Sequence, residues 1–453
     1  MKRLMRPDVW FLPALLGAAV LGAVLLSDGA NITAGENEIK HHRTRHGWES
    51  AFDAFSAVCG VGLLTRDFEA DLTSRGRWTL TAIGLFGAVL FLGAAAQAAQ
   101  QLREAAGGPR LPSAALAVGV FLLALLPGVP LVWGVERAAG SNGGWESAAQ
   151  HTAAAFASLG WLRPAPGDAT AWVYAIIALA GAVGWPVWFL LIPAARRRFV
   201  QAAPLLRGVG VYVLILVVLG AVLCGFETPR EMLGRGLPSE NTLAGRPLPE
   251  RFARSVLQAV SASTAGIPTE ALASPQCSDG TRITLGGVLL VGGLGGSPGG
   301  GIKGPLFVWL LAGGAVVLGA SRCRTTHMGT LRCALAGSTL VVLMLVLTLV
   351  VAGGLLVIDD RTRSPFDHPA TFAEAWLDAA SAVAGGNLSS GLTARVTGEN
   401  LSSGGRHPVD QYQYGMAWLM FAMTLGRFLP LFVLSRMATV RIDDASRGVS
   451  PLI

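Results

Sequence analysis

Charged residues are scarce in this chain of 453 residues. Asp, Glu, Lys and Arg make up 14% of the sequence, whereas hydrophobic residues make up 52%, and the mean hydropathy is +0.52. Soluble globular proteins carry about 25% charged residues, and disordered chains have low hydrophobicity. The composition therefore excludes both classes and predicts a protein that crosses a membrane several times.

Cysteine and histidine are also scarce. The five cysteines show no CxxC spacing and no disulfide framework, and the seven histidines form no metal-binding pattern. Acid–base side chains are almost absent from the apolar segments, which argues against a multi-pass membrane enzyme, the rival class. We therefore expect no enzyme activity and no tightly bound cofactor. The basic pI of about 9.6 needs no nucleic-acid partner, because the charges divide between the two sides of a membrane.

Eight apolar segments are candidates for membrane-spanning helices, which need roughly 20 residues each. The first follows Lys2, Arg3 and Arg6 as in a signal peptide, but no clean cleavage site follows it, so we interpret it as a retained helix. With both termini in the cytoplasm, Lys and Arg predominate in the inner loops, and Asp and Glu in the outer ones. The expected spans are 9–28, 77–100, 112–136, 169–194, 206–226, 283–320, 331–358 and 411–437.

A short internal repeat lies between successive spans. Gly47-Trp48-Glu49-Ser50-Ala51 recurs as Gly144-Trp145-Glu146-Ser147-Ala148, and a stretch of small residues follows each copy. Weaker copies lie near 250–266 and 372–388. Each copy predicts about 12 helical residues, which reach roughly 18 Å and are too short to cross the bilayer core. The helices are either amphipathic surface helices or re-entrant half-helices, and four copies in register favour the second interpretation.

The repeat predicts an all-α integral membrane fold of four span–short helix–span units with pseudo-fourfold symmetry. The C-terminal ends of the short helices would point their negative dipole ends at a common axis, and glycines would turn backbone carbonyls inward. Rings of carbonyls around an axis form a dehydrated cation site. The expected repeats are 1–105, 106–203, 204–328 and 329–453, around a central pore.

A glycine-rich stretch interrupts the sixth apolar segment. Gly295-Gly296-Ser297-Pro298-Gly299-Gly300-Gly301-Ile302-Lys303 places helix breakers and a lysine where lipid could not satisfy the freed backbone groups. The stretch is either a flexible kink or a functional loop on a polar pathway. It is not a nucleotide P-loop, because Gly304 follows Lys303 where Ser or Thr is required.

In combination, these features resemble the Trk/Ktr/HKT superfamily of potassium and sodium transport proteins over nearly the whole chain. The motifs that carry the resemblance are the glycine-rich stretch, Ser261–Gly266, Leu388–Thr393 and Gly426–Leu431. The resemblance implies a single-chain pore in the cell membrane, namely the inner membrane of a bacterium. Potassium ions would be the transported substrate. Family members are typically homodimers, and bacterial ones often have a separate cytosolic nucleotide-binding regulatory subunit. Membrane lipids and potassium ions are the remaining expected partners.

The resemblance also implies roles for particular residues of this chain. Gly62, Gly160 and Gly266 would be the filter glycines, and the glycine loop 295–301 in the third repeat would be the gate below the filter. The expected ion-binding residues, with potassium at the filter, are Cys59, Gly60, Val61, Gly62, Ser158, Leu159, Gly160, Thr264, Ala265, Gly266, Gly385, Gly386 and Asn387. The expected gating residues are Gly295, Gly296, Gly299, Gly300, Gly301, Lys303 and Arg427.

Three departures from the family pattern leave alternatives open. Asn387 stands at the fourth filter position if the alignment has no gap, whereas a one-residue slip places Gly386 there. The glycine loop is about three residues shorter than usual, and Trp161 follows the second filter glycine. Sodium permeability, the ion-binding subunit of a multi-chain pump and a degenerate, non-conducting scaffold or sensor are the alternatives.

The two intramembrane bases have competing interpretations. Near the axis, Arg427 or Lys303 would repel a passing cation by several kcal/mol at about 4 Å and an effective dielectric near 20. Such a barrier would prevent a free leak. Alternatively, Arg427 is a structural partner of carbonyls at helix ends, and Lys303 extends toward the cytoplasm.

Overall fold

The computed structural model describes residues 7–31, 43–105, 113–141, 143–161, 168–191, 202–227, 243–264, 266–267, 272–273, 277–294, 296–302, 327–363, 368–397 and 410–446. Within these ranges the secondary structure is helical, without β-strands. Six helical segments are long and apolar enough to cross a membrane, as expected of a multi-pass membrane protein. They are Pro7–Leu26, Ser74–Gln101, Ala114–Ala138, Leu206–Phe226, Gly337–Thr362 and Tyr412–Val433.

The long helices follow the apolar segments of the sequence. Their outward faces keep large hydrophobic side chains exposed, such as Val20 and Leu214, which is the pattern of a surface that meets lipid. The helices that lie in these apolar segments are α1 (Pro7–Leu26), α3 (Ser74–Ala105), α4 (Ala114–Leu125), α5 (Gly128–Ala138), α7 (Asp168–Ala182), α10 (Ala202–Phe226), α14 (His327–Thr362) and α17 (Asp410–Ser446).

Two expected spans are less regular than the sequence predicts. The span expected at 112–136 consists of α4 and α5, which meet at Pro127 because proline cannot continue the helical hydrogen-bond ladder. In the span expected at 169–194, α7 ends at Ala182. Gly184 has φ +77°, and the short α8 (Trp185–Trp188) and the 3₁₀ turn η2 (Phe189–Leu191) follow it.

Each short helix predicted by the repeat is present. Two have 16 residues rather than 12, because their first turns extend into the preceding polar loops. The four are α2 (Arg43–Val58), α6 (Trp145–Phe156), α11 (Leu248–Ser263) and α15 (Phe372–Ala384). Thr371 caps α15 in a capping box with Glu374. The smaller elements are η1 (Gly29–Asn31), η3 (Leu243–Gly245), α12 (Asp279–Val291) and α16 (Leu392–Thr397).

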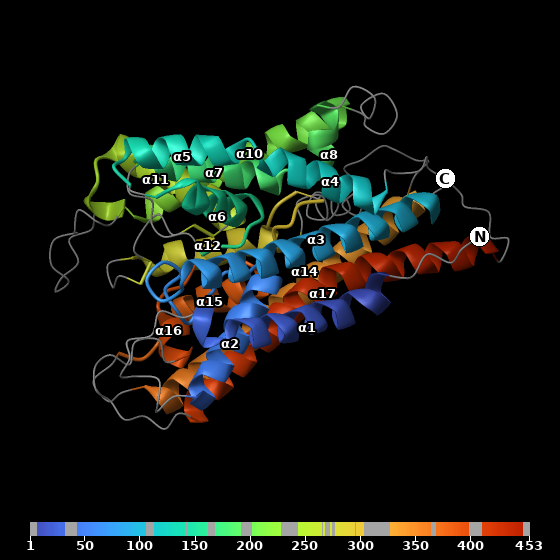
Figure 1. Ribbon diagram of the computed structural model, residues 1–453. Helices are drawn as coiled ribbons and strands as arrows, with labels where there is room; N and C mark the ends of the chain where they lie inside the picture. The colour runs from blue at the N-terminus through green and yellow to red at the C-terminus, as the bar shows by residue number, and fades with distance from the viewer. Residues whose placement is uncertain are drawn as a thin grey trace.

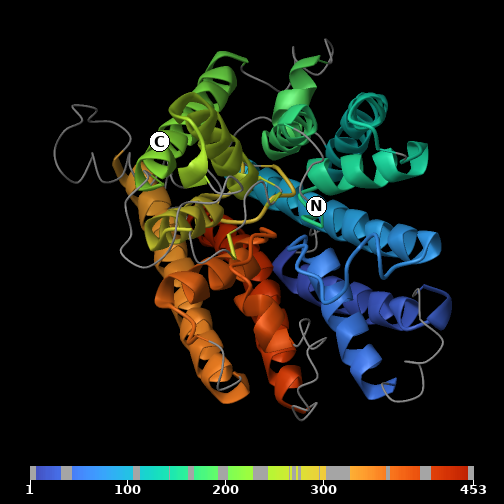
Figure 2. The ribbon, with the colours of Figure 1, turned by 90° about the vertical axis from the view of Figure 1, so that its left-hand side faces the viewer.

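The helices associate in four groups that follow one another along the chain. Within each group the short helix contacts the helices before and after it in sequence. The groups are α1, α2 and α3; α4 to α7; α10, α11 and α12; and α14, α15 and α17. Successive groups touch through the pairs α3–α4, α7–α11 and α12–α15, and α17 returns to α3. Figure 2, which looks along the long helices, shows the four colour sectors in this order around a common centre.

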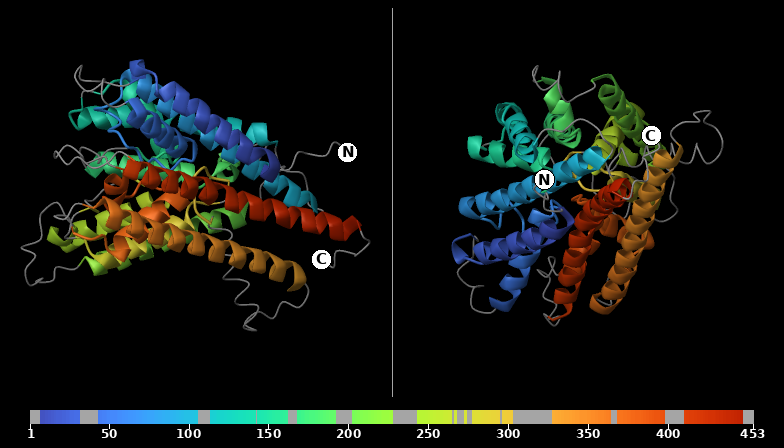
Figure 3. Two further views of the ribbon diagram at one scale, coloured as in Figure 1. Left: turned by 90° about the horizontal axis from the view of Figure 1, so that it is seen from below. Right: turned by 90° about the vertical axis from the view of Figure 1, so that its right-hand side faces the viewer.

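The long helices run roughly side by side, and the helix ends define two ends of the molecule. The beginning of α1 and the end of α17 lie at the same end, as Figures 1 and 3 show. The short helices α2, α6, α11 and α15 lie toward the opposite end in Figure 1. The centre of the molecule is therefore where the C-terminal ends of the short helices and the segments after them can meet.

Candidate functional site

The segments after the four short helices begin with a shared backbone turn. In each, one N–H donates to the carbonyl five residues earlier, at 2.7–3.0 Å. The donors are Val61, Leu159, Gly266 and Gly386, and the acceptors are Ser56, Ala154, Ser261 and Ser381. The turn ends each helix abruptly and sends the chain back, as a re-entrant segment requires.

In the first two segments, left-handed backbone conformations occur directly before and directly after the donor residue of the turn. Gly60 and Gly62 have φ +60° and +80°, and Ser158 and Gly160 have φ +57° and +82°. Side chains rarely tolerate this region, so the spacing of the two glycines in the first repeat has a direct backbone reason. In the third and fourth segments, Gly266 and Gly385 have φ +61° and +73°.

The three predicted filter glycines and Asn387 lie together. A Cβ on Gly62 would overlap the Leu159 carbonyl and the backbone of Gly160, and one on Gly160 would overlap the side chain of Asn387. A Cβ on Gly266 would overlap the backbone of Gly386 and Asn387. The structure thus brings together residues that are more than 300 positions apart in the sequence.

The other predicted filter residues flank this cluster. Cys59, Val61, Ser158, Leu159 and Thr264 are buried, and Gly60 and Gly385 both lie against the guanidinium of Arg427. Ala265 lies outside the described residues.

Two buried aspartates, which the sequence analysis did not identify, accept hydrogen bonds from the segments that follow the turns. Asp53 on α2 accepts hydrogen bonds from the N–H of Thr65 at 2.8 Å and from its hydroxyl at 3.0 Å. Asp378 on α15 accepts from the N–H of Ser390 and of Thr393, both at 2.6 Å. The first aspartate lies nine residues before Gly62 and the second nine residues before Asn387. That equal spacing was the signal available in the sequence.

Position nine before Gly160 is occupied by His151, which belongs to a different buried cluster. Its Nδ1 lies 2.6 Å from Glu136 Oε1, and its Nε2 lies 3.3 Å from Glu69 Oε1. Tyr174 also donates to Glu136. The cluster joins α5, α6 and α7 to the loop after the first filter segment. Among the described residues, no group of three or more His, Cys, Asp and Glu side chains could hold a metal ion.

The glycine stretch interrupts the third group as expected, but the break begins earlier. Helix α12 ends at Val291, and Gly292 already has φ +66°. The Trp185 N–H donates to the Gly296 carbonyl at 3.1 Å, and the Leu294 N–H donates to the Ala182 carbonyl at 2.9 Å. The loop is therefore fixed to the second group. Gly295 and Lys303 lie outside the described residues.

The tip of the loop lies against the ends of the short helices. A Cβ on Gly299 would lie 3.4 Å from Ser158 Oγ and 3.8 Å from the Thr264 carbonyl. A Cβ on Gly300 would overlap the carbonyl of Ala384, the last residue of α15. The loop thus covers the cluster from the side on which the helices end.

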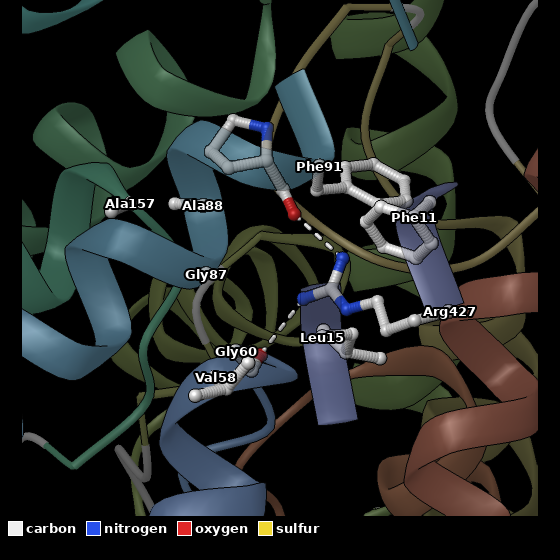
Figure 4. Close-up of a pocket in the computed structure, with 10 residues that line it drawn as sticks. Phe11, Leu15, Val58, Gly60, Gly87, Ala88, Phe91, Ala157 and Arg427 are labelled. Carbon is white, nitrogen blue, oxygen red and sulfur yellow. Dashed lines mark hydrogen bonds between the residues drawn. The ribbon is translucent and has the colours of Figure 1, made fainter. Parts of the chain in front are cut away.

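Arg427 links the loop to the first predicted filter segment. Its guanidinium donates to the carbonyls of Cys59, Pro298 (2.7 Å) and Gly60 (3.1 Å), and the side chain is 4% exposed. Figure 4 shows it reaching from α17 toward Gly60 and beside Phe91, whose ring centre lies 5.0 Å from the guanidinium carbon. These carbonyl partners offset the cost of a buried arginine. Such contacts are what the interpretation of Arg427 as a structural partner of carbonyls at helix ends requires.

A cavity of about 300 Å³ lies on the other side of the cluster. Gly62, Trp161 and Asn387 line it, together with residues that follow the first and fourth predicted filter segments. Trp161, one of the departures from the family pattern, stacks on Phe68 with ring centres 5.7 Å apart. The cluster therefore separates this cavity from the glycine loop and Arg427.

The comparison with solved structures identifies the fold. The chain is similar to the crystal structure of the potassium transporter TrkH from Vibrio parahaemolyticus, with a TM-score of 0.65 and 18% sequence identity. The similarity covers 96% of this chain and 85% of that chain. No protein-family model and no curated protein sequence matches the chain. The chain has the fold of TrkH, as the resemblance of the motifs predicted.

Proposed function

We propose that the chain conducts potassium ions across a cell membrane through a pore at the centre of its four helix groups. The observation that carries this proposal is the meeting of Gly62, Gly160, Gly266 and Asn387, one from each group, at the ends of four short helices. Glycines allow the backbones to approach closely, and the helix ends direct negative dipole charge at the same place. A dehydrated cation is the ligand that such a site would bind.

The proposed pore uses four repeats with the boundaries 1–105, 106–203, 204–328 and 329–453. Each repeat contributes one filter segment, and the closed ring of contacts between the groups supports an axis at their centre. The solved transporter of the same fold is a potassium transporter, which supports potassium as the substrate. The cavity beside Gly62 and Asn387 would be the outer vestibule, with both termini in the cytoplasm.

The gate in this proposal consists of the glycine loop and Arg427. The loop covers the helix-end side of the filter, and Arg427 holds Pro298 of the loop and Gly60 of the filter with the same guanidinium. A cation that leaves the filter meets this positive charge, which repels it. Displacement of the loop would withdraw one carbonyl from the guanidinium and open the path.

Further assignments rest on the resemblance. We propose a homodimer in the inner membrane of a bacterium, with membrane lipids around the exposed apolar helix faces. A separate cytosolic nucleotide-binding subunit would act on the loop. We propose no catalytic residues and no tightly bound cofactor.

Tracer uptake into proteoliposomes tests the proposal. Wild-type protein should take up potassium or rubidium tracer, and Gly62→Asp should abolish the uptake or its preference for potassium, because any side chain at Gly62 overlaps Leu159 and Gly160. Gly353→Ala on α14 is the matched control, because a Cβ there meets nothing within 4 Å. Measurable uptake that is equal in Gly62→Asp and wild type would contradict the proposed pore.

A further inference from the structure

Asn387 is the exception among the residues that meet at the filter. The turn donors Val61, Leu159, Gly266 and Gly386 align the four segments. Asn387 therefore stands where Gly62 and Gly160 stand in the first two segments, and Ile267 stands there in the third. Both of those glycines have φ near +80°, whereas Asn387 is not among the described non-glycine residues with positive φ. The fourth segment therefore presents a side chain where the first two present a left-handed glycine.

The backbone on both sides of Asn387 is fixed. On one side Gly386 closes the turn onto Ser381, and on the other Leu388 donates to the hydroxyl of Ser381 at 3.2 Å. The following residues are held by Asp378, which accepts four hydrogen bonds from Ser389, Ser390 and Thr393. The position of the Asn387 side chain is thus determined by its own repeat and not by a flexible loop.

The Asn387 side chain crosses the centre of the ring. Its amide nitrogen donates a hydrogen bond to the carbonyl of Gly160. Helix groups touch in the order first, second, third, fourth and back to first, so the second and fourth groups face each other across the centre. A bond from Asn387 to Gly160 therefore spans the axis, whereas the contact between Gly62 and Gly160 joins neighbours.

A hydrogen bond at this place competes with a cation. The Gly160 carbonyl that accepts the amide N–H directs its oxygen at a donor and not at an ion. A dehydrated cation needs several such oxygens at once, and their number and field strength contribute to the preference for potassium over sodium. The amide hydrogens also place positive partial charge where the cation would lie.

We propose that Asn387 is a specificity-determining residue that latches the filter through its bond to Gly160. The latch limits entry of monovalent cations and lowers the preference for potassium, because one carbonyl is available only when the bond opens. This inference rests on the proposed function. It assigns to one side chain a restriction that is separate from the gate at Arg427.

Asn387→Gly, Asn387→Ala and Asn387→Asp in proteoliposomes test the latch. Glycine and alanine remove the donor, so potassium uptake should rise about three- to tenfold, the equilibrium effect of one net hydrogen bond. The potassium-to-sodium ratio should rise most with glycine. Aspartate keeps the shape but cannot donate when ionised, and it should raise uptake of both cations. Asn31→Ala is the matched control, because Asn31 is a buried asparagine whose amide donates to the Leu25 carbonyl outside the filter.

The outcomes separate the latch from the proposed function. Wild-type uptake with no increase in the glycine and alanine variants would overturn the latch and leave the pore in place. A silent wild type with a conducting Asn387→Gly variant would support both. Thermal unfolding in potassium and in a large organic cation provides a readout without transport: Asn387→Gly should gain stabilisation by potassium that wild type lacks. If no variant conducts and none is stabilised by potassium, both proposals are wrong.

Discussion

Asp378 provides the most direct test of how the fourth proposed filter segment is held in place. Its side chain is fully buried and accepts from the N–H groups of Ser390 and Thr393 at 2.6 Å, and from the hydroxyls of Ser389 at 2.9 Å and Thr393 at 2.8 Å. Asp378→Ala leaves two backbone N–H groups without their acceptor. Each such group costs about 1–3 kcal/mol, so the free energy of unfolding should fall by about 2–6 kcal/mol.

The conservative variants give a graded expectation. Asp378→Asn retains one acceptor oxygen, and whichever side its NH₂ group takes, at least one backbone donor meets another donor. Its free energy of unfolding should therefore lie between those of wild type and Asp378→Ala. Thr393→Val removes only a hydroxyl bond, which is worth about 1 kcal/mol. Thr348→Val on α14 is the control, because that buried hydroxyl bonds only within its own helix.

Reversible unfolding in mixed micelles measures the stability, and tracer uptake measures the function at matched amounts of folded protein. Because the aspartate holds the residues that follow Asn387, Asp378→Asn should also change the potassium-to-sodium uptake ratio, whereas Thr348→Val should not. If Asp378→Ala unfolds like wild type, or if Asp378→Asn leaves the uptake ratio unchanged, the aspartate does not position the proposed filter segment.

Three further predictions concern the gate and the first repeat. Arg427→Ala should raise potassium uptake, and Arg427→Lys should preserve more of the electrostatic barrier to cations. If the alanine variant folds but has the same or lower uptake, the role of Arg427 is purely structural. In the glycine loop, Gly300→Ala should alter the regulation of flux because its Cβ overlaps Ala384, whereas Gly299→Ala is the tolerated control, and equal behaviour of the two would mean a passive kink. Asp53→Ala leaves the N–H of Thr65 without its acceptor and removes the carboxylate 3.9 Å from Arg66, which still pairs with Glu49. In the same unfolding assay it should destabilise by about 1–3 kcal/mol, less than Asp378→Ala, and a larger loss would contradict this estimate.

The helices of the fold could be predicted from the sequence, because each follows from a local pattern of residues. Apolar runs of sufficient length predict the long helices, and the repeat around Trp48 and Trp145 predicts short helices between them. Helix α6 spans the 12 residues that the repeat suggested. The bend at Pro127 was not predicted, although proline within an apolar run is its evident cause.

The site was less accessible from the sequence because it depends on contacts between distant segments. Glycine spacing predicted filter positions, and the structure places Gly62 against Gly160 and Gly266 against Asn387. The partners of Arg427 could not be predicted from the sequence, because Gly60 and Pro298 lie 367 and 129 positions away in the chain. The hydrogen bond from Asn387 to Gly160 could not be predicted either, because it requires the second and fourth groups to face each other.

Membrane potential in proteoliposomes under a potassium gradient tests the central claim most directly. Vesicles that contain wild-type protein and more potassium inside than outside should develop an inside-negative potential. Replacement of internal potassium by sodium should reduce this potential, and replacement by a large organic cation should abolish it. Vesicles that develop no potential with potassium, in wild type and in Asn387→Gly alike, would contradict a cation pore at the centre of this fold.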